Sequence, residues 1–71
     1  MQYSVILTPE PEGGFTITMP AFPEYVGYAE TEDEELALAR EGIAFEVERL
    51  RERGQSPPAE PGPPKVVVVA A

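Results

Sequence analysis

The longest regular pattern of apolar and polar positions runs from residue 31 to residue 54. Apolar residues in this segment recur at steps of three and four, which places them on one stripe of a helix with about 3.6 residues per turn. The stripe consists of Leu36, Ala39, Ile43, Val47 and Leu50. The pattern therefore predicts one amphipathic helix whose apolar stripe packs against the rest of the chain.

Both ends of this segment carry residues that favour helix boundaries. We expect Thr31 to cap the first turn and to exchange hydrogen bonds with Glu34, the reciprocal arrangement known as a capping box. Gly54 can adopt the left-handed conformation that ends many helices. The first turn is acidic and the last turn is basic, so side-chain charge and helix dipole agree at both ends.

Two shorter segments before the helix have the composition of strands. Residues 3–8 are rich in β-branched and aromatic side chains, and residues 15–19 alternate apolar residues with threonine. Residues 9–14, between them, combine prolines with glycines, which is typical of a turn. We expect the two segments to pair as an antiparallel hairpin, and residues 25–29 to add a short third strand.

The part of the chain after the helix divides into two segments. Residues 54–64 hold five of the nine prolines and should form an extended connection. Residues 65–71 are an apolar run after one lysine, which suits a fourth strand that is buried or joined to a partner. A right-handed crossover through the helix would place this strand parallel to the first. The prediction is a single α+β domain, residues 1–71, with the order β-β-β-α-β and the helix on one sheet face.

Size and composition narrow the classes of protein to which the chain can belong. A chain of 71 residues is close to the lower limit for a stable core, because it buries only about 60% of its unfolded surface. We therefore expect it to self-associate as a homo-oligomer. No apolar run exceeds six residues, and the N-terminus lacks the pattern of a signal peptide. The expected location is the cytoplasm, without contact to a membrane.

The charge of the chain favours a basic partner. Thirteen acidic residues against five basic ones give a formal net charge of −8, so direct nucleic-acid binding is disfavoured by repulsion from the phosphates. Five of the acidic residues gather at the start of the predicted helix and form a candidate acidic patch: Glu30, Glu32, Asp33, Glu34 and Glu35. The patch can complete the helix dipole, steer a basic protein toward the chain, or do both.

A second candidate surface lies on the side of the helix away from the apolar stripe. Leu38 and Phe45 fall at about 200° and 180° around the helix from Leu36, and Gly42 falls beside them at about 240°. Single exposed apolar residues are ordinary on protein surfaces. Two large ones with a glycine between them also suit a contact with another helix. We hypothesise that Leu38, Gly42 and Phe45 form a self-association or partner surface.

Three short motifs carry a resemblance to a known family. They are Gly14-Phe15, the run from Pro20 to Tyr25, and Glu30-Thr31 followed by Glu34-Glu35-Leu36 at the helix start. Together they resemble the HicB family of antitoxins over roughly residues 3 to 60. The resemblance implies a degenerate RNase H-like domain with the β-β-β-α-β order.

The sequence also departs from the pattern of that family. Ala21 and Glu24 stand where an acidic residue and a glycine are usual, and Ala29 stands where a glycine is common. No DNA-binding domain follows within the 71 residues, so operator binding is not expected.

The resemblance implies a function in protein binding. A HicB-like protein binds and masks a small basic HicA-type toxin that cleaves mRNA, and the charge of this chain independently favours such a partner. The alternative is an orphan, self-associating HicB-like module without a toxin. A third class, a small-molecule-binding module, would use Tyr3, Tyr25 and Tyr28 to line a pocket, although aromatic residues in short strands more often pack in the core.

We expect no catalytic activity. RNase H-type hydrolysis needs several carboxylates that converge on divalent metal ions, but Asp33 is the only aspartate and the first two predicted strands contain no acidic residue. Histidine and cysteine are absent, so the usual general base and thiol nucleophile are missing. The prediction is a protein with no catalytic residues, no metal site and no cofactor.

Overall fold

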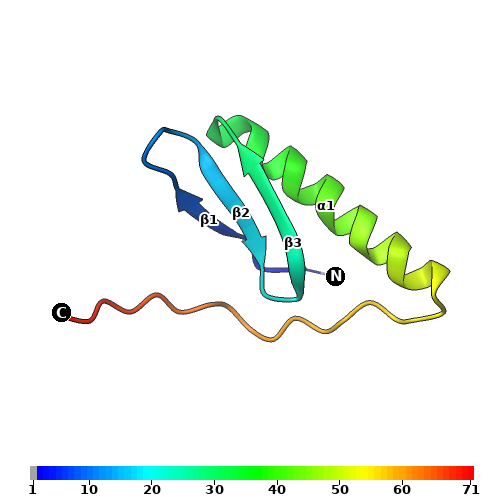
Figure 1. Ribbon diagram of the computed structural model, residues 1–71. Coiled ribbons are helices and arrows are strands. Elements are labelled where there is room, and N and C mark those ends of the chain that lie inside the picture. The colour runs from blue at the N-terminus through cyan, green and yellow to red at the C-terminus, as the bar shows by residue number, and fades with distance from the viewer. Residues whose placement is uncertain (1) are drawn as a thin grey trace.

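The computed structural model describes residues 2–71 and contains one sheet and one helix (Figure 1). The elements, in chain order, are β1 (Ile6–Pro9), β2 (Phe15–Met19), β3 (Phe22–Ala29) and α1 (Glu32–Glu52). The strands lie in the order β1-β2-β3, and both neighbouring pairs are antiparallel. The predicted α+β class, the hairpin and the single long helix are confirmed.

The turn between β1 and β2 has the conformation that its glycines allow. Gly13 and Gly14 have φ angles of 104° and 77°, a region that residues with a side chain rarely adopt. The backbone N–H of Glu10 donates to the carbonyl oxygen of Gly14 at 3.0 Å, which closes the loop. The strand that enters this turn begins at Ile6 rather than at Tyr3, the start expected from the sequence.

The third strand is longer than the sequence predicts. It begins at Phe22, three residues before Tyr25, and pairs with β2 from Phe22 opposite Met19 onward, across an irregularity between Thr18 and Met19. Proline lacks an N–H donor, but Pro23 is tolerated here because β3 is an edge strand. The connection between β2 and β3 is therefore only Pro20 and Ala21, and Pro23 lies inside β3 without ending it.

The core lies between the sheet and α1. Ile17, Met19, Phe22, Ala29 and Ala39 are the buried apolar residues. The helix contacts β3 most, β2 less, and β1 not at all. Tyr3, although outside β1, packs its ring edge-on against Phe22 with the ring centroids 4.9 Å apart.

The buried face of the helix is close to the predicted stripe but is turned around the axis. Ala39, Ile43 and Val47 face the core as expected, whereas Leu36 is 63% exposed and does not. The two buried helix positions, Ala39 and Glu46, lie at about 300° and 280° around the axis from Leu36, so the buried face is centred about 50° from the predicted direction. A prediction from apolar residues alone gives no weight to a buried glutamate, so it placed the stripe too close to Leu36.

The second face of the sheet is open. The strand register aligns Ile6, Thr18 and Val26 in one row and Thr8, Thr16 and Tyr28 in the next. These side chains point away from the helix, because alternate residues of a strand face opposite sides. None of the six carries a charge.

The chain after the helix is extended, as the prolines predict, but it does not rejoin the sheet. Gly54, with a φ of 72°, ends the helix, and residues 55–60 return toward the N-terminal segment. There the hydroxyl of Tyr3 donates to the carbonyl oxygen of Pro58 at 2.8 Å, and the backbone N–H of Ser4 donates to the Glu60 carboxylate. These two bonds tie the connection to the segment that leads into β1.

The predicted fourth strand is not formed within the described residues 2–71. The tail, residues 61–71, contains no strand and runs past the lower ends of β2 and β3 to the end marked C (Figure 1). Pro61, Pro63 and Pro64 precede the valines and have no N–H to donate to a neighbouring strand. The prediction that residues 65–71 lie parallel to the first strand is therefore wrong for the single chain.

Candidate functional site

The candidate acidic patch lies exposed at the start of α1. Glu30, Glu32, Asp33 and Glu34 are exposed, and Glu35 is half-buried. Thr31 occupies the N-cap position in an extended conformation, but its side chain makes no capping hydrogen bond. The capping-box bonds predicted between Thr31 and Glu34 are therefore wrong. The acidic residues of the first turn still interact favourably with the exposed N–H groups and the positive end of the helix dipole.

The three residues of the second candidate surface line one groove between α1 and β3. Leu38 is half-buried and Phe45 is 66% exposed, so the apolar side of the groove is open to solvent. The groove has a volume of about 560 Å³. Its lining, from both elements, is Glu24, Tyr25, Val26, Leu38, Glu41, Gly42, Phe45 and Glu46.

Gly42 has a role in this groove that differs from the one expected. A Cβ atom at this position would lie 2.6 Å from Cζ of Tyr25, far closer than a van der Waals contact. The Tyr25 hydroxyl donates to the carbonyl oxygen of Leu38 at 3.4 Å. The space beside Gly42 is thus filled by Tyr25 of the same chain and is not available for a second helix.

Gly27 provides matching space on the strand side. A Cβ atom at Gly27 would lie 3.0 Å from Cζ of Tyr25. The tyrosine ring therefore lies against two glycines, one from each element, and a side chain at either position would require the ring to move. The sequence shows each glycine as a weak point of its element, but it does not show that one side chain uses both.

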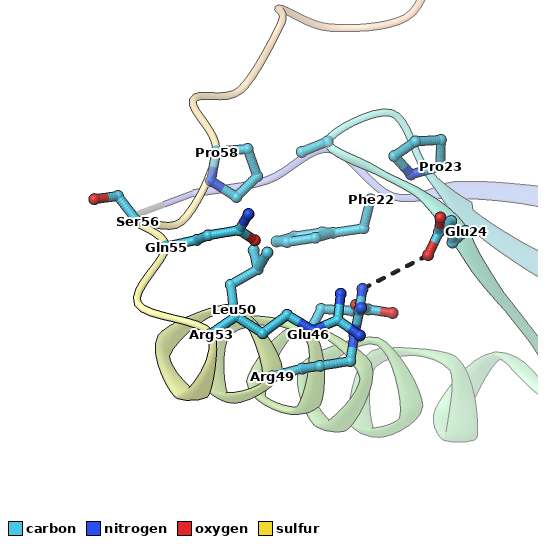
Figure 2. A pocket seen from close by; sticks show the side chains of 11 residues that line it. Phe22, Pro23, Glu24, Glu46, Arg49, Leu50, Arg53, Gln55, Ser56 and Pro58 are labelled. Atoms are coloured by element: carbon cyan, nitrogen blue, oxygen red, sulfur yellow. Dashed lines mark hydrogen bonds and ion pairs between the residues drawn. The ribbon is translucent and has the colours of Figure 1, made fainter.

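A second hollow, of about 490 Å³, lies at the other end of the helix (Figure 2). Phe22, Leu50 and Pro58 give it an apolar wall. Arg49 and Glu46 form a charged pair at its edge, where the side chains of α1 meet the start of β3.

Glu46 is buried but paired. It is only 6% exposed, and its Oε2 accepts hydrogen bonds from Arg49, at 3.1 Å from Nε and 2.6 Å from Nη2. The Arg49 Nη2 also lies 3.7 Å from Oε2 of Glu24, the ion pair drawn in Figure 2. The hydrogen bond and charge of Glu46 raise the pKa of Arg49 above its usual value. This pair removes much of the penalty for placing a carboxylate in the interior.

This charged network was not predicted from the sequence. Glu46 and Arg49 are three residues apart on the helix, a spacing at which side chains meet. That spacing was a visible signal, but Glu24 comes from β3 and only the fold brings it close.

The three tyrosines do not line a common pocket. Tyr3 packs on Phe22, Tyr25 lies in the α1–β3 groove, and the Tyr28 hydroxyl on the open sheet face donates to the carbonyl oxygen of Gly13 at 3.0 Å. A tyrosine-lined ligand site is therefore not formed.

Across residues 2–71, no three acidic side chains gather closely enough to hold a metal ion. The single helix described there is not apolar enough over a sufficient length to cross a membrane. No family model, curated protein or solved structure matches the chain. The groove between α1 and β3, with the acidic patch at the start of the same helix, is the candidate site.

Proposed function

We propose that the chain is a protein-binding module that holds a basic partner in the α1–β3 groove. The observation that carries the proposal is the lining of that groove. Its floor is apolar, with Leu38 half-buried and Phe45 exposed, and its charged residues are the three glutamates Glu24, Glu41 and Glu46. An apolar floor beside carboxylates suits an amphipathic segment whose polar side is basic.

The charge distribution supports the same choice of partner. Glu46 and Glu24 are already paired with Arg49, whereas Glu41 forms no ion pair with a basic side chain of residues 2–71. The acidic patch at the start of α1 adds further negative potential on the same helix. Such a field speeds the association of a basic protein, and added salt weakens it.

The specific form of the proposal is an antitoxin. The three HicB-like motifs, the net charge of −8 and the groove together favour a module that neutralises a small basic HicA-type toxin by covering it. A degenerate RNase H-like fold, completed by a fourth strand, belongs to this proposal. The alternative is an orphan module that only self-associates, and the exposed valines of the tail favour it.

Phe45→Asp is the test of the groove. The tagged chain and its Phe45→Asp variant are used to capture proteins from the source organism, with elution by rising salt. The wild type should retain a small basic protein, and the variant should bind it at least about tenfold more weakly, since a central aromatic residue of an interface contributes roughly 1–3 kcal/mol. The captured protein should cleave RNA, and the added wild-type chain should stop the cleavage.

Ala37→Asp is the matched control, because it adds the same charge at an exposed position of the same helix outside the groove lining. It should change binding by less than about threefold. Equal binding by wild type and Phe45→Asp would overturn the groove as the binding site. Recovery of the chain alone, as a defined oligomer, would overturn the antitoxin role in favour of the orphan module.

A further inference from the structure

The two edges of the sheet differ in how they are covered. The helix lies along β3, while β1 lies at the opposite edge and contacts only β2 among the secondary-structure elements (Figure 1). Backbone bonding alternates along an antiparallel pair, and Glu10 bonds to Gly14 at the end of this one. By that alternation, Ile6 and Thr8 bond to β2, and Leu7 directs its N–H and C=O to the free edge.

The tail supplies an unpaired segment that favours strand structure. Residues 66–69 are four consecutive valines, and each is between 70% and 93% exposed. Valine is among the residues most favoured in strands, and an exposed run of this kind associates readily with free sheet edges. The chain therefore has one segment that favours strand structure but is unpaired, and one sheet edge with no neighbouring strand.

The β1 edge of the same chain does not fit this segment. Pro58 is bonded to Tyr3 and Glu60 to Ser4, so the tail follows the direction of the chain into β1. Counted residue for residue from Glu60 beside Ser4, residues 61–65 would lie opposite residues 5–9. Val66 would then already lie beyond Pro9, where β1 ends.

We propose that residues 66–71 of one copy pair with the β1 edge of a second copy, and that the second copy returns the same contact. Each chain contributes one strand and one edge, so a two-fold exchange leaves neither unpaired. The missing fourth strand of each sheet is then supplied by the partner copy. The proposal is independent of the toxin and of the α1–β3 groove.

The charge of the chain favours a second copy as the protein that binds at the β1 edge. Two chains of −8 repel each other, so they associate most easily through uncharged surfaces. Residues 6–9 and residues 66–71 contain no charged side chain, and Lys65 adds a positive charge beside the tail contact. These two segments carry no carboxylate side chain that could attract a basic partner. The glutamates of the groove lie near β3, at the opposite edge of the sheet.

Single proline substitutions at two adjacent tail positions test the pairing. The N–H groups of Val67 and Val68 would point to opposite sides of the added strand, one toward β1 and one toward solvent. Of Val67→Pro and Val68→Pro, one should weaken the dimer at least roughly 30-fold and the other less than about threefold, because an edge strand tolerates proline only where its N–H faces out. Sedimentation equilibrium over a range of protein concentrations measures both.

Val67→Thr and Val68→Thr are the controls, since they keep a β-branched side chain and the N–H group. Both should retain the dimer. A wild-type chain that stays monomeric at millimolar concentration would overturn the proposal, as would equal effects of the two prolines, whether absent or large. All four substitutions lie at exposed positions without packing in the single chain, so its fold is preserved.

A cross-linking experiment identifies the surface that the tail occupies. The chain has no cysteine, so Thr8→Cys and Val68→Cys provide unique thiols on β1 and on the tail. When the two variants are mixed, a short bis-maleimide should join Thr8→Cys to Val68→Cys as the main product. A main product that joins two Val68→Cys chains would place tail against tail and would overturn the β1 contact.

Discussion

The β3 and β1 edges of this sheet show how a small domain completes one side and leaves the other open. At β3, the helix that follows directly in the chain lies along the strand, and Tyr25 fits between two glycines, one from each element. At β1, none of the helices and strands formed by residues 2–71 covers the edge, although a segment that favours strand structure is present sixty residues later. The first edge is covered through contacts between elements close in sequence, whereas the second edge stays uncovered in the single chain.

The difference has an energetic cause. Packing α1 against β3 requires the closure of only the short loop between them. To reach β1, the tail must first pass through the stiff proline-rich connection. That connection is tied at Tyr3 and Ser4, which fixes where the tail leaves the sheet. The covered edge therefore contributes to the stability of the single chain, and the bare edge is the surface at which we propose that a second copy binds.

The largest expected effect is a difference in unfolding free energy between substitutions on the two faces of β2. Ile17 is fully buried beneath the helix, so Ile17→Ala should lower the free energy of unfolding by about 2–5 kcal/mol through lost burial and the cavity that remains. Thr18→Ala, on the open face of the same strand, should cost less than about 1 kcal/mol. Urea unfolding followed by circular dichroism measures both. Similar losses would show that the open face is as closely packed as the covered one.

A smaller effect tests the fit of Tyr25 at the covered edge. Gly42→Ala should destabilise the chain by about 1–2 kcal/mol, because overpacking against the ring outweighs the gain of up to about 1 kcal/mol in helix propensity. In a Tyr25→Ala background the same substitution should become stabilising. A double-mutant cycle from thermal melts gives the coupling. Stabilisation by Gly42→Ala in both backgrounds would mean that the ring does not need the glycine.

Local sequence patterns predicted the parts of the fold that depend on neighbouring residues. The spacing of Ala39, Ile43 and Val47 located the helix, and the two glycines at 13 and 14 located the turn, because both features arise within a few residues. Strand limits were less accurate, since Pro23 is acceptable or unacceptable only according to whether its strand lies at an edge.

The site was predicted less completely than the fold. The angles of Leu38 and Phe45 around the helix predict a shared surface, and the two residues do line one groove with Gly42. The occupant of the space beside Gly42 and the burial of Glu46 depend on residues of β3, which no helical periodicity contains. The tail had a strong strand pattern, but strand propensity does not identify the sheet edge that the segment will join.

The smallest expected effect concerns the bare edge and depends on protein concentration. At micromolar concentration, below association, Val68→Pro should change the free energy of unfolding by less than about 0.5 kcal/mol, because Val68 is 93% exposed. As concentration rises, the wild-type Tm should increase by a few degrees, since association stabilises the folded state by mass action. The Tm of a variant that cannot pair should stay constant.

Added salt should enlarge the wild-type increase, because it screens the repulsion between two chains of −8, whereas it should weaken the binding of a basic partner to the groove. Opposite responses to salt would therefore separate the two surfaces in one protein, and a wild-type Tm independent of concentration would leave the valines without a partner copy.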